Sequence, residues 1–305
     1  MSIISQHPFN LIVVLGPTAS GKTSLGVKLA KQFEGEIISA DSRQVYRGMD
    51  IGSGKDLDEY GDIPYHLIDI VDPGYEFNVF EFQKCFCDAF STIEQHHHLP
   101  LLVGGTGLYL ASILNQYQFT EVPVNPTLRE ELANQSHEAM VTRLKSLNPS
   151  LHNTTDTIEP DRLIRAIEIA EAEATQPKPS VDLPSLNPLI FGIKWDRSLL
   201  KVRITERLKQ RINHGLIEEV ERLHQGGVSW ESLHFYGLEY RFVASYLKGE
   251  LNKNDMYQKL NSAIHTFSKQ QEKWFRRMER NGTKIHWLDG PTDPYHQALE
   301  VIATC

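Results

Sequence analysis

The segment "LIVVLGPTASGKTS", residues 11–24, decides the fold. Its first five residues are apolar and predict a buried strand, and Gly16–Thr23 match the pattern G-x-x-x-x-G-K-[ST] in full. The residues that follow place Leu25, Leu29 and Phe33 on one face of a helix. A strand, a glycine-containing loop and a helix in this order predict a phosphate-binding loop, because loop N–H groups and a helix N-terminus both attract anions.

Each residue of this loop has an expected role in holding phosphate. Lys22 is expected to reach the terminal phosphate and Thr23 to ligate magnesium, while the glycines let the backbone curl around the anion. The alternative is an ordinary glycine turn, which the flanking strand and helix disfavour. The predicted diphosphate-binding residues are Gly16, Pro17, Thr18, Ala19, Ser20, Gly21, Lys22 and Thr23.

Further apolar runs predict the remaining strands, and most are separated by stretches of helical length. Strands that alternate with helices favour a mostly parallel sheet covered on both faces. We therefore expect an α/β fold of the P-loop NTPase type with flanking helices. The predicted strands are "LIVVLG", "EIISAD", "YHLIDIV", "PLLVGG", "PLIFGIKW" and "KIHWL".

The alternation of strands and helices stops after about residue 112 and resumes near residue 185. Only helical patterns occur between these points, so we expect a helical insertion over residues 116–184 that binds tRNA if the resemblance described below holds. Residues 1–115 and 185–305 then form the catalytic core with its C-terminal helices. Within the core, residues 198–227 predict either a helix pair or one long bent helix.

Composition indicates a protein of the cytoplasm. The chain has three cysteines, no apolar stretch of about 20 residues that would span a membrane, and no secretory signal pattern. The net charge of −8 argues mildly against nucleic acid as a partner. However, the segment 269–284 contains six basic and two acidic residues. This basic segment is either a solvated helix face or a surface for phosphates.

Polar residues follow other predicted strands at the edge where ligands lie in open α/β sheets. Asp41 follows the strand "EIISA" and either binds magnesium, accepts a proton, or only shapes a turn. Thr106 follows a Gly-Gly pair and either offers its hydroxyl to a ligand or caps a helix. Asp69 and Asp72 offer the second acidic strand end that kinases and ATPases use for magnesium, or are turn residues.

Six motifs occur in the order found in tRNA dimethylallyltransferases, and together they cover about Leu11 to Asp289. They are "GPTASGKT", "IISADSRQVYRGMDIGSGK", "PYHLIDIVDP", "PLLVGGTGLYL", "DRLIRAIEI" and "LIEEVERL". The resemblance implies transfer of a dimethylallyl group from dimethylallyl diphosphate to N6 of adenosine 37, next to the tRNA anticodon. The loop would then hold the diphosphate of a prenyl donor, with Mg²⁺, rather than the phosphates of a nucleotide.

The resemblance also assigns catalytic roles. Asp41 resembles the general base that removes a proton from the weakly nucleophilic adenine amine. Thr18 matches a residue near the bridging oxygen of the diphosphate, and Arg207 matches a basic residue that reaches the diphosphate. Arg203 lies one helical turn from Arg207, so the sequence leaves open a swap of the two.

The family's tRNA-contacting positions map onto residues in both the core and the insertion. Arg162 and Arg165 are three apart on one predicted helix, so they either face the RNA together or are solvated surface arginines. We expect the anticodon stem-loop of tRNA as the macromolecular partner of a monomer. The predicted tRNA-binding residues are Asp41, Ser42, Arg43, Gln44, Thr106, Arg129, Asp161, Arg162, Leu163, Ile164 and Arg165.

The chain departs from the family pattern at two places. Two extra residues separate Gly237 from Tyr240, and Gln270 stands where an arginine is common. Both changes fall in the half expected to bind tRNA and not in the phosphate loop. No Cys/His zinc module follows the core, so the chain resembles the bacterial type.

Three alternatives belong to other functional classes. An adenylate isopentenyltransferase, acting on free AMP, ADP or ATP, shares this core, but the helical insertion and the basic segment favour tRNA. A P-loop small-molecule kinase is disfavoured because no clear second magnesium-binding strand is found. A non-catalytic RNA-binding protein would not need Lys22, Thr23 and Asp41 together. The run His96–His98 invites a metal site, but adjacent side chains point in different directions, so we do not expect one.

Overall fold

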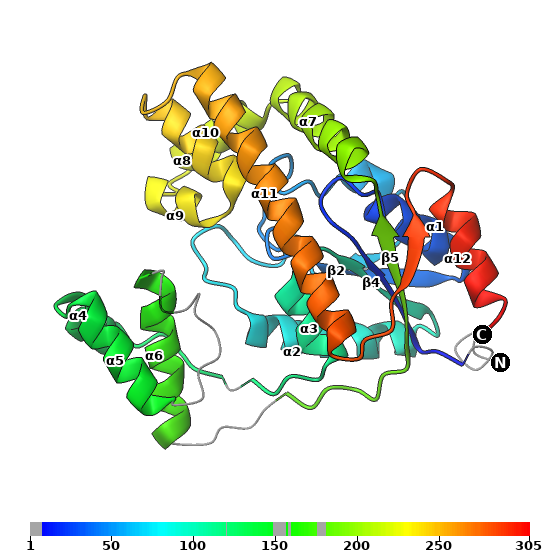
Figure 1. The fold of residues 1–305 in the computed structure, drawn as a ribbon, viewed down its shortest axis with the longest axis horizontal. Coiled ribbons are helices and arrows are strands. Elements are labelled where there is room, and N and C mark those ends of the chain that lie inside the picture. The colour runs from blue at the N-terminus through cyan, green and yellow to red at the C-terminus, as the bar shows by residue number, and fades with distance from the viewer. Residues whose placement is uncertain (1–7, 120, 149–156, 158–159, 176–180) are drawn as a thin grey trace. The chain divides into compact units, whose positions relative to one another are not determined.

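The computed structural model describes residues 8–119, 121–148, 157, 160–175 and 181–305. Its centre is a six-stranded sheet in the order β3-β2-β4-β1-β5-β6, and each neighbouring pair is parallel (Figure 1). The expected α/β fold with a mostly parallel sheet is confirmed. The strands are β1 (Leu11–Leu15), β2 (Gly35–Ala40), β3 (Tyr65–His66), β4 (Leu99–Gly104), β5 (Pro188–Lys194) and β6 (His286–Asp289).

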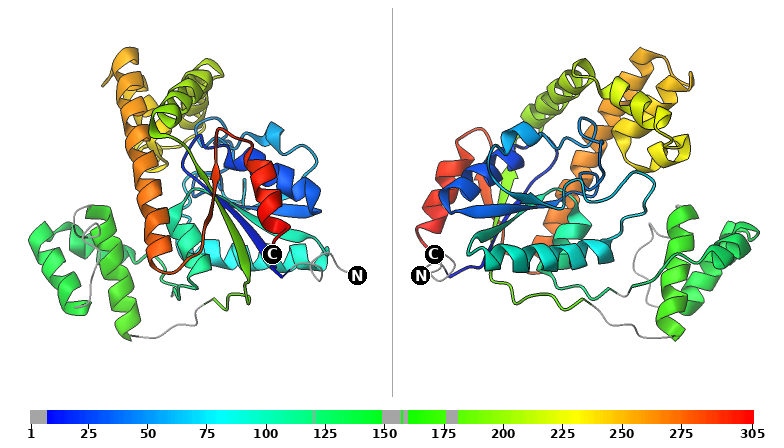
Figure 2. Two further views of the ribbon diagram at one scale, coloured as in Figure 1. Left: turned by 45° about the vertical axis from the view of Figure 1, so that its right-hand side comes forward. Right: turned by 180° about the vertical axis from the view of Figure 1, so that it is seen from behind.

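Alternate residues of the central strands pack against helices on opposite faces of the sheet. Leu11, Val13 and Leu15 point to the face covered by α2 (Val79–Gln95), α3 (Gly107–Leu114) and the end of α11 (Lys253–Arg280). Ile12 and Val14 point to the other face, covered by α1 (Lys22–Gln32) and α12 (Pro294–Ile302) (Figure 2). Burial on both faces explains why the strands read as continuous apolar runs.

A separate group of helices packs on the chain between β2 and β3 and forms a third apolar core. Its helices are α7 (Arg197–Asn213), α8 (Leu216–Gln225), α9 (Trp230–Phe235), α10 (Leu238–Leu247) and the first half of α11. The short helix η2 (Leu57–Glu59) lies on the same connection between β2 and β3. Residues 198–227 form a helix pair, because Gly215, with φ of 100°, breaks the path between α7 and α8.

The chain divides into two compact units, one of residues 1–117 and 183–305 and the other of residues 118–182. The described part of the second unit consists of α4 (Pro126–Ala133), α5 (His137–Leu147) and α6 (Pro160–Thr175), which share an apolar core of their own. As expected from the sequence, Asn125 caps α4 and Pro126 begins it. The described residues of this unit contain no strand.

The expected strand over residues 65–71 is short in the structure. Only Tyr65 and His66 pair with β2, because Leu67 and Asp69 adopt left-handed backbone conformations with φ of 63° and 57°. Apolar residues of this segment, such as Leu67 and Ile68, still enter the core. The apolar run therefore marked burial correctly but not a continuous strand.

Among the described residues, no helix is both long and apolar enough to cross a membrane.

Candidate active site

The predicted phosphate loop joins β1 to α1 at the carboxyl end of the sheet. Ala19 and Gly21 have left-handed backbone angles, with φ of 61° and 90°, and α1 begins directly after Gly21. No side chain caps this helix, so its first N–H groups are left for an anion. Pro17, Ala19 and Ser20 are buried, whereas Thr18 and Thr23 are partly exposed. The loop therefore has the backbone geometry of an anion site.

Lys22 is the central cation of this loop. Its ammonium lies 3.5 Å from the carbonyl oxygen of Pro17. Desolvation, followed by the positive charge of Arg207, lowers the pKa of Lys22 to about 8, although the nearby Asp41 acts in the opposite direction. A poorly solvated lysine beside another cation is stabilised by an anionic ligand. This environment is the strongest electrostatic sign that the loop binds phosphate.

Two arginines of α7 lie beside the phosphate loop. Arg203 donates from Nε to the carbonyl of Ala19 at 2.8 Å, and its guanidinium lies 4.2 Å from the ring centre of Trp195. Arg207 forms an ion pair with Asp56. The structure thus places Arg203 directly on the loop and Arg207 near Lys22, so both candidates from the sequence remain at the site.

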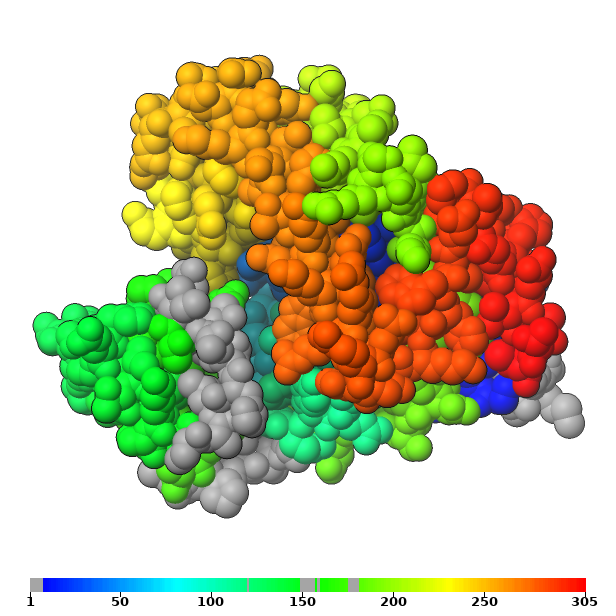
Figure 3. All heavy atoms as spheres, viewed as in Figure 1, coloured from blue at the N-terminus to red at the C-terminus, as the bar shows by residue number. Residues whose placement is uncertain are grey.

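A small pocket adjoins the loop and combines cationic with aliphatic walls. Arg211 pairs with Glu239 at 3.2 Å along one side of it. Burial, with Arg207 as the next contribution, lowers the pKa of Arg211, whereas burial raises the pKa of Glu239. In Figure 3, deep-blue N-terminal residues are visible between α7 and α11. The pocket is lined by Thr18, Ala19, Ile204, Arg207, Leu208, Arg211, Glu239 and Ile264.

Asp41 and Thr106 lie at the ends of two adjacent strands. Asp41 follows β2, and its Oδ1 accepts a hydrogen bond from the backbone N–H of Arg43 at 2.9 Å. Thr106 precedes α3, and its hydroxyl accepts a hydrogen bond from the N–H of Ser42 at 3.1 Å. Thr106 therefore links the two strand ends and makes no capping bond to α3. The Asp41 carboxylate acts electrostatically on Lys22, which places the two groups in one site.

Sequence reasoning missed Gln271, the residue of α11 that holds the loop in place. Its side-chain oxygen accepts from the N–H of Thr18 at 2.8 Å, and its side-chain nitrogen donates to the carbonyl of Gly105 at 2.9 Å. Gln271 is buried, whereas Gln270, at the family departure, is exposed. The helical pattern of the basic segment 269–284 could have assigned the two glutamines to different faces.

The chemistry of the loop fits a magnesium ion. Thr23 offers a hydroxyl in the first turn of α1, and Asp41 offers a carboxylate beside Lys22. Mg²⁺ commonly takes one or two protein oxygens and completes its coordination with substrate phosphates and water. Thr23 is the expected ligand, and metal binding by the Asp41 carboxylate is an alternative to proton transfer by that residue.

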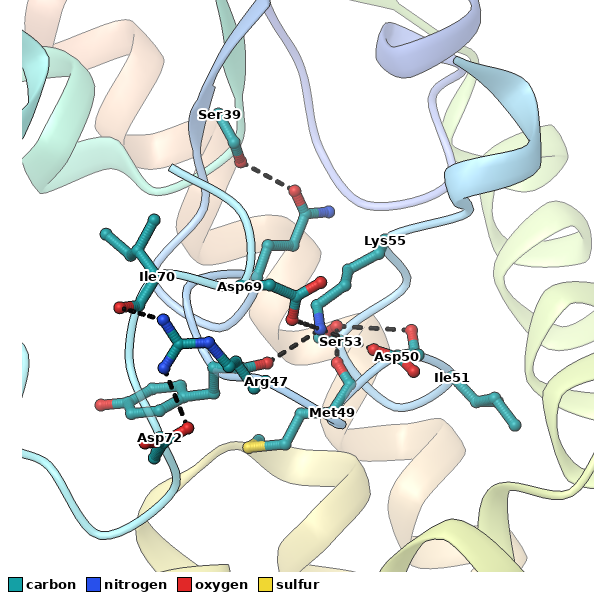
Figure 4. Close-up of polar contacts among 12 residues, drawn as sticks. Ser39, Arg47, Met49, Asp50, Ile51, Ser53, Lys55, Asp69, Ile70 and Asp72 are labelled. Carbon is teal, nitrogen blue, oxygen red and sulfur yellow. Dashed lines mark hydrogen bonds and ion pairs between the residues drawn. The ribbon is translucent and has the colours of Figure 1, made fainter. Parts of the chain in front are cut away.

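Asp69 and Asp72 belong to a structural network and not to this site (Figure 4). Lys55 is fully buried, and its ammonium donates to the carbonyl of Tyr46 at 2.8 Å and pairs with both Asp50 and Asp69. Asp72 pairs with Arg47 at 2.9 Å. The turn interpretation of these aspartates is therefore correct, and the network fixes the path of the chain between β2 and β3.

The predicted tRNA-binding residues after β2 differ in their surroundings. Gln44 is buried, accepts from the hydroxyl of Ser39 at 2.7 Å and donates to the carbonyl of Gly54 at 3.0 Å. Ser42 and Arg43 are partly exposed beside Asp41. The guanidinium of Arg43 lies 5.3 Å from the ring centre of Phe235, which is itself 53% exposed. Gln44 thus supports the segment from inside, while Arg43 faces a surface.

In the helical unit, two predicted tRNA-binding arginines share one buried carboxylate. Arg129 and Arg165 bond to Glu168 at 2.8 Å and 2.9 Å, and Arg165 also donates to the carbonyl of Val122 at 2.6 Å. Burial would raise the pKa of Glu168, but the hydrogen bonds from the two arginines outweigh it and lower the pKa. This cluster joins α4 to α6.

The remaining predicted residues of this helix divide between core and surface. Leu163 is fully buried in the apolar core of the unit, and Ile164 packs against that core. Asp161 and Arg162 are exposed. Arg162 and Arg165 therefore do not have equivalent surroundings, because only Arg165 is engaged by Glu168.

Comparison with known proteins places this arrangement in a family. Residues 44–278 match the IPP transferase family, and residues 9–60 match the isopentenyl transferase family. The tRNA dimethylallyltransferase 1 of Geotalea uraniireducens is 65% identical, with 96% of this chain and 97% of that protein covered. The corresponding protein of Geotalea daltonii is 64% identical, with 97% and 95% covered.

A solved structure agrees with these sequence comparisons. The crystal structure of the full-length tRNA isopentenylpyrophosphate transferase from Bacillus halodurans superimposes with a TM-score of 0.70 at 31% identity, covering 97% of this chain and 95% of that one. The similarity thus includes both the P-loop core and the helical insertion. The chain belongs to the IPP transferase family, the family of the tRNA dimethylallyltransferases.

Proposed function

We propose that this protein transfers a dimethylallyl group from dimethylallyl diphosphate to N6 of adenosine 37, next to the anticodon of tRNA, and releases diphosphate. The observation that supports this most directly is the poorly solvated Lys22 in an uncapped helix N-terminus, faced by Arg203 and Arg207 and next to Asp41. A cationic cradle beside one carboxylate suits a reaction in which an anion leaves and a proton is removed.

The diphosphate binds the loop, and its departure is assisted by positive charge. As the bond between the prenyl carbon and the diphosphate oxygen breaks, its electron pair moves onto that oxygen. The loop N–H groups, Lys22 and Arg207 stabilise the growing negative charge, because they are already oriented toward it. Thr18, whose N–H is held by Gln271, lies at the pocket beside these cations. Arg203 holds the loop through Ala19.

The hydrocarbon of the donor requires apolar contacts that the same pocket provides. Ile204, Leu208 and Ile264 line it together with Thr18 and two arginines. Aliphatic side chains next to cations are compatible with a small prenyl diphosphate. The preference for a prenyl donor over ATP is supported by the relatives, which are named tRNA dimethylallyltransferases.

Asp41 acts as the general base. The lone pair of the adenine N6 is delocalised into the ring, so the new carbon–nitrogen bond forms more readily as a base removes the N6 proton. Asp41 accepts that proton while the nitrogen attacks the prenyl carbon. Its hydrogen bond from the N–H of Arg43 orients the carboxylate at the end of β2.

A magnesium ion bound at Thr23 would neutralise charge on the leaving diphosphate. Thr23, in the first turn of α1, is the residue that would present an oxygen to it.

The tRNA must present the adenosine outside its stack, as other substrates of base-modifying enzymes do. In the core unit, Arg43, whose backbone N–H contacts Asp41, lies against the exposed ring of Phe235, and this pair suits a flipped or neighbouring base. In the helical unit, the exposed Arg162 suits a backbone phosphate. We place the protein in the cytoplasm, where its tRNA substrate is found, as a monomer.

A direct assay tests the substrate assignment. Protein, magnesium and dimethylallyl diphosphate are incubated either with bulk tRNA that lacks the modification or with AMP, and the nucleosides are resolved by mass. We expect prenylated adenosine only from tRNA, and none with Asp41→Asn under the same conditions. Prenylated AMP with unmodified tRNA would instead identify an adenylate isopentenyltransferase.

A further inference from the structure

A second polar cluster lies at the end of the sheet opposite to the phosphate loop. Glu36, near the start of β2, is only 2% exposed, yet its carboxylate contacts three imidazoles. Oε1 lies 2.7 Å from Nδ1 of His96 and 2.7 Å from Nδ1 of His98, and Oε2 lies 2.6 Å from Nε2 of His66. The transfer reaction uses none of these four residues.

Three separate segments bring the imidazoles to one carboxylate. Glu36 shares a strand face with Ile38, whose register partner on β3 is His66. His96 ends α2, and His98 directly precedes β4. His97 between them has a left-handed backbone with φ of 61°, so the chain turns there. Adjacent histidines do point in different directions, as expected, because His97 is not in the cluster, but His96 and His98, two residues apart, converge on Glu36.

We propose that Glu36, His96 and His98 form a binding site for a divalent transition-metal ion such as Zn²⁺. Imidazole nitrogen and carboxylate oxygen are the donors that such ions prefer, whereas Mg²⁺ favours oxygen alone. The donor atoms of Glu36, His96 and His98 all lie within 4.8 Å of one another. His66 contacts the second carboxylate oxygen and would orient Glu36 from that side, outside the group of ligands.

The distances allow an ion to enter after a small adjustment. Tetrahedral ligands about 2.0–2.1 Å from zinc lie roughly 3.3 Å apart, so the Glu36 contacts of 2.7 Å would open by about 0.6 Å, and the two imidazole nitrogens, now within 4.8 Å, would settle at the same spacing. The side chains of His66, His96 and His98 are 23%, 52% and 40% exposed, so they have room to move and leave an entry path. Each ligating nitrogen would carry its lone pair toward the ion, with any proton on the other ring nitrogen.

The charge of the cluster also favours a cation. The Glu36 carboxylate is almost fully buried, and a buried carboxylate is stabilised by positive charge placed beside it. A bound ion would supply that charge directly, in place of the hydrogen bonds from His96 and His98.

Three protein ligands would leave the fourth position of a tetrahedral zinc site to a water molecule. The ion would tie the end of α2 and the start of β4 to β2. Because the amino ends of the strands lie away from the phosphate loop, we expect prenyl transfer to continue without the ion. The proposed metal site would therefore stabilise this end of the sheet, and it is independent of the proposed prenyl transfer.

The test uses the full chain without a histidine tag. Zn²⁺ is titrated in excess Mg²⁺ by calorimetry, Co²⁺ is titrated by visible absorption, and melting curves are recorded with and without Zn²⁺. The variants are Glu36→Gln and the pair His96→Ala with His98→Ala. The matched control is His97→Asn, because Asn tolerates the left-handed backbone and removes a histidine that is not in the cluster.

We expect one tight zinc ion per chain, a Co²⁺ spectrum of tetrahedral type and a higher melting temperature with Zn²⁺ for the parent and for His97→Asn. Both cluster variants should bind at least about tenfold more weakly and lose the zinc-dependent rise in melting temperature. Parent protein that binds no zinc, or cluster variants that are folded and bind it as tightly as the parent, would overturn the proposal. Glu36→Gln preserves the side-chain shape, so its zinc affinity alone tests the proposal if the double variant fails to fold.

Discussion

The environment of Lys22 disfavours its positive charge and so favours the binding of an anion. Its pKa is lowered to about 8 by desolvation and by Arg207, so the folded protein holds this proton less tightly than the unfolded chain does. The charged form therefore destabilises the fold below about pH 8, and this cost disappears as the pH rises toward the ordinary lysine value. A bound diphosphate removes the same cost by supplying negative charge.

The affinity for inorganic diphosphate should consequently depend on pH. Above about pH 8, Lys22 loses its proton in the free protein, so affinity should fall by about tenfold for each further pH unit. Lys22→Arg stays charged and should show a flatter profile, while Lys22→Ala should bind weakly at every pH. Calorimetry between about pH 7 and pH 9.5 measures this. If the affinity for diphosphate depended on pH in the same way in the parent and in Lys22→Arg, Lys22 would not be part of the phosphate site.

Asp41→Asn should nearly abolish prenyl transfer while both substrates remain bound. Asn accepts the hydrogen bond from Arg43 that the structure shows, but it cannot accept the N6 proton. Loss of a general base typically lowers rates by about 10²–10⁴-fold. A single-turnover assay with saturating tRNA and donor, repeated across magnesium concentrations, measures the effect.

A melting curve of the same variant separates the alternatives for Asp41. If Asp41 mainly held magnesium, excess magnesium would restore the rate, and if it were only a turn residue, thermal stability would fall. A stable variant with a nearly parental rate would exclude Asp41 as the base.

At the scale of elements, α11 positions the phosphate loop through Gln271. Gln271→Leu removes hydrogen bonds to Thr18 and Gly105 in a buried place, which should cost about 2 kcal/mol of unfolding free energy and weaken diphosphate binding. Gln270→Leu is the matched control, because that side chain is exposed and its change should stay within about 0.5 kcal/mol. Urea unfolding and calorimetry give both quantities. Equal losses in the two variants would mean that α11 does not position the loop.

The sequence predicted the elements whose signals are local. Strand burial and the loop before α1 follow from residues within a few positions of one another. The motif at residues 16–23 and the resemblance therefore indicated the phosphate site directly.

Features that depend on distant contacts could not be predicted from the sequence. The segment after His66 reads as a strand, but Lys55 draws Asp69 into a buried network and the backbone turns. In the sequence, Gln271 is one polar residue among many. Only the packing of α11 in the folded protein shows that it bonds to Thr18 and Gly105. The convergence of His96 and His98 likewise depends on the backbone angle of His97.

At the scale of the whole molecule, the helical unit should contribute to tRNA binding through its surface. Arg162→Ala should weaken tRNA binding and reduce the salt slope by about one phosphate contact, because that arginine is exposed. Filter binding across salt concentrations measures the slope. Lys145→Ala, an equal change of charge on α5, is the control for a general field effect.

The two neighbouring arginines should behave differently from Arg162. Arg165→Ala and Arg129→Ala each leave the buried Glu168 short of a partner, so they should lower the melting temperature as well. If the salt dependence of tRNA affinity were unchanged in Arg162→Ala, Arg162 would be a solvated surface residue that does not contact a tRNA phosphate.

The length of α11 has a consequence for how the core unit unfolds. With 28 residues it extends for about 42 Å. Met256 and Leu260 near its start belong to the apolar core of α7–α10, and Phe275 near its end belongs to the core on the sheet. One continuous helix therefore couples two cores that would otherwise be able to open separately. In native-state hydrogen exchange, amides of both cores should report the same opening free energy, and Lys269→Gly on the exposed side of α11 should lower both together.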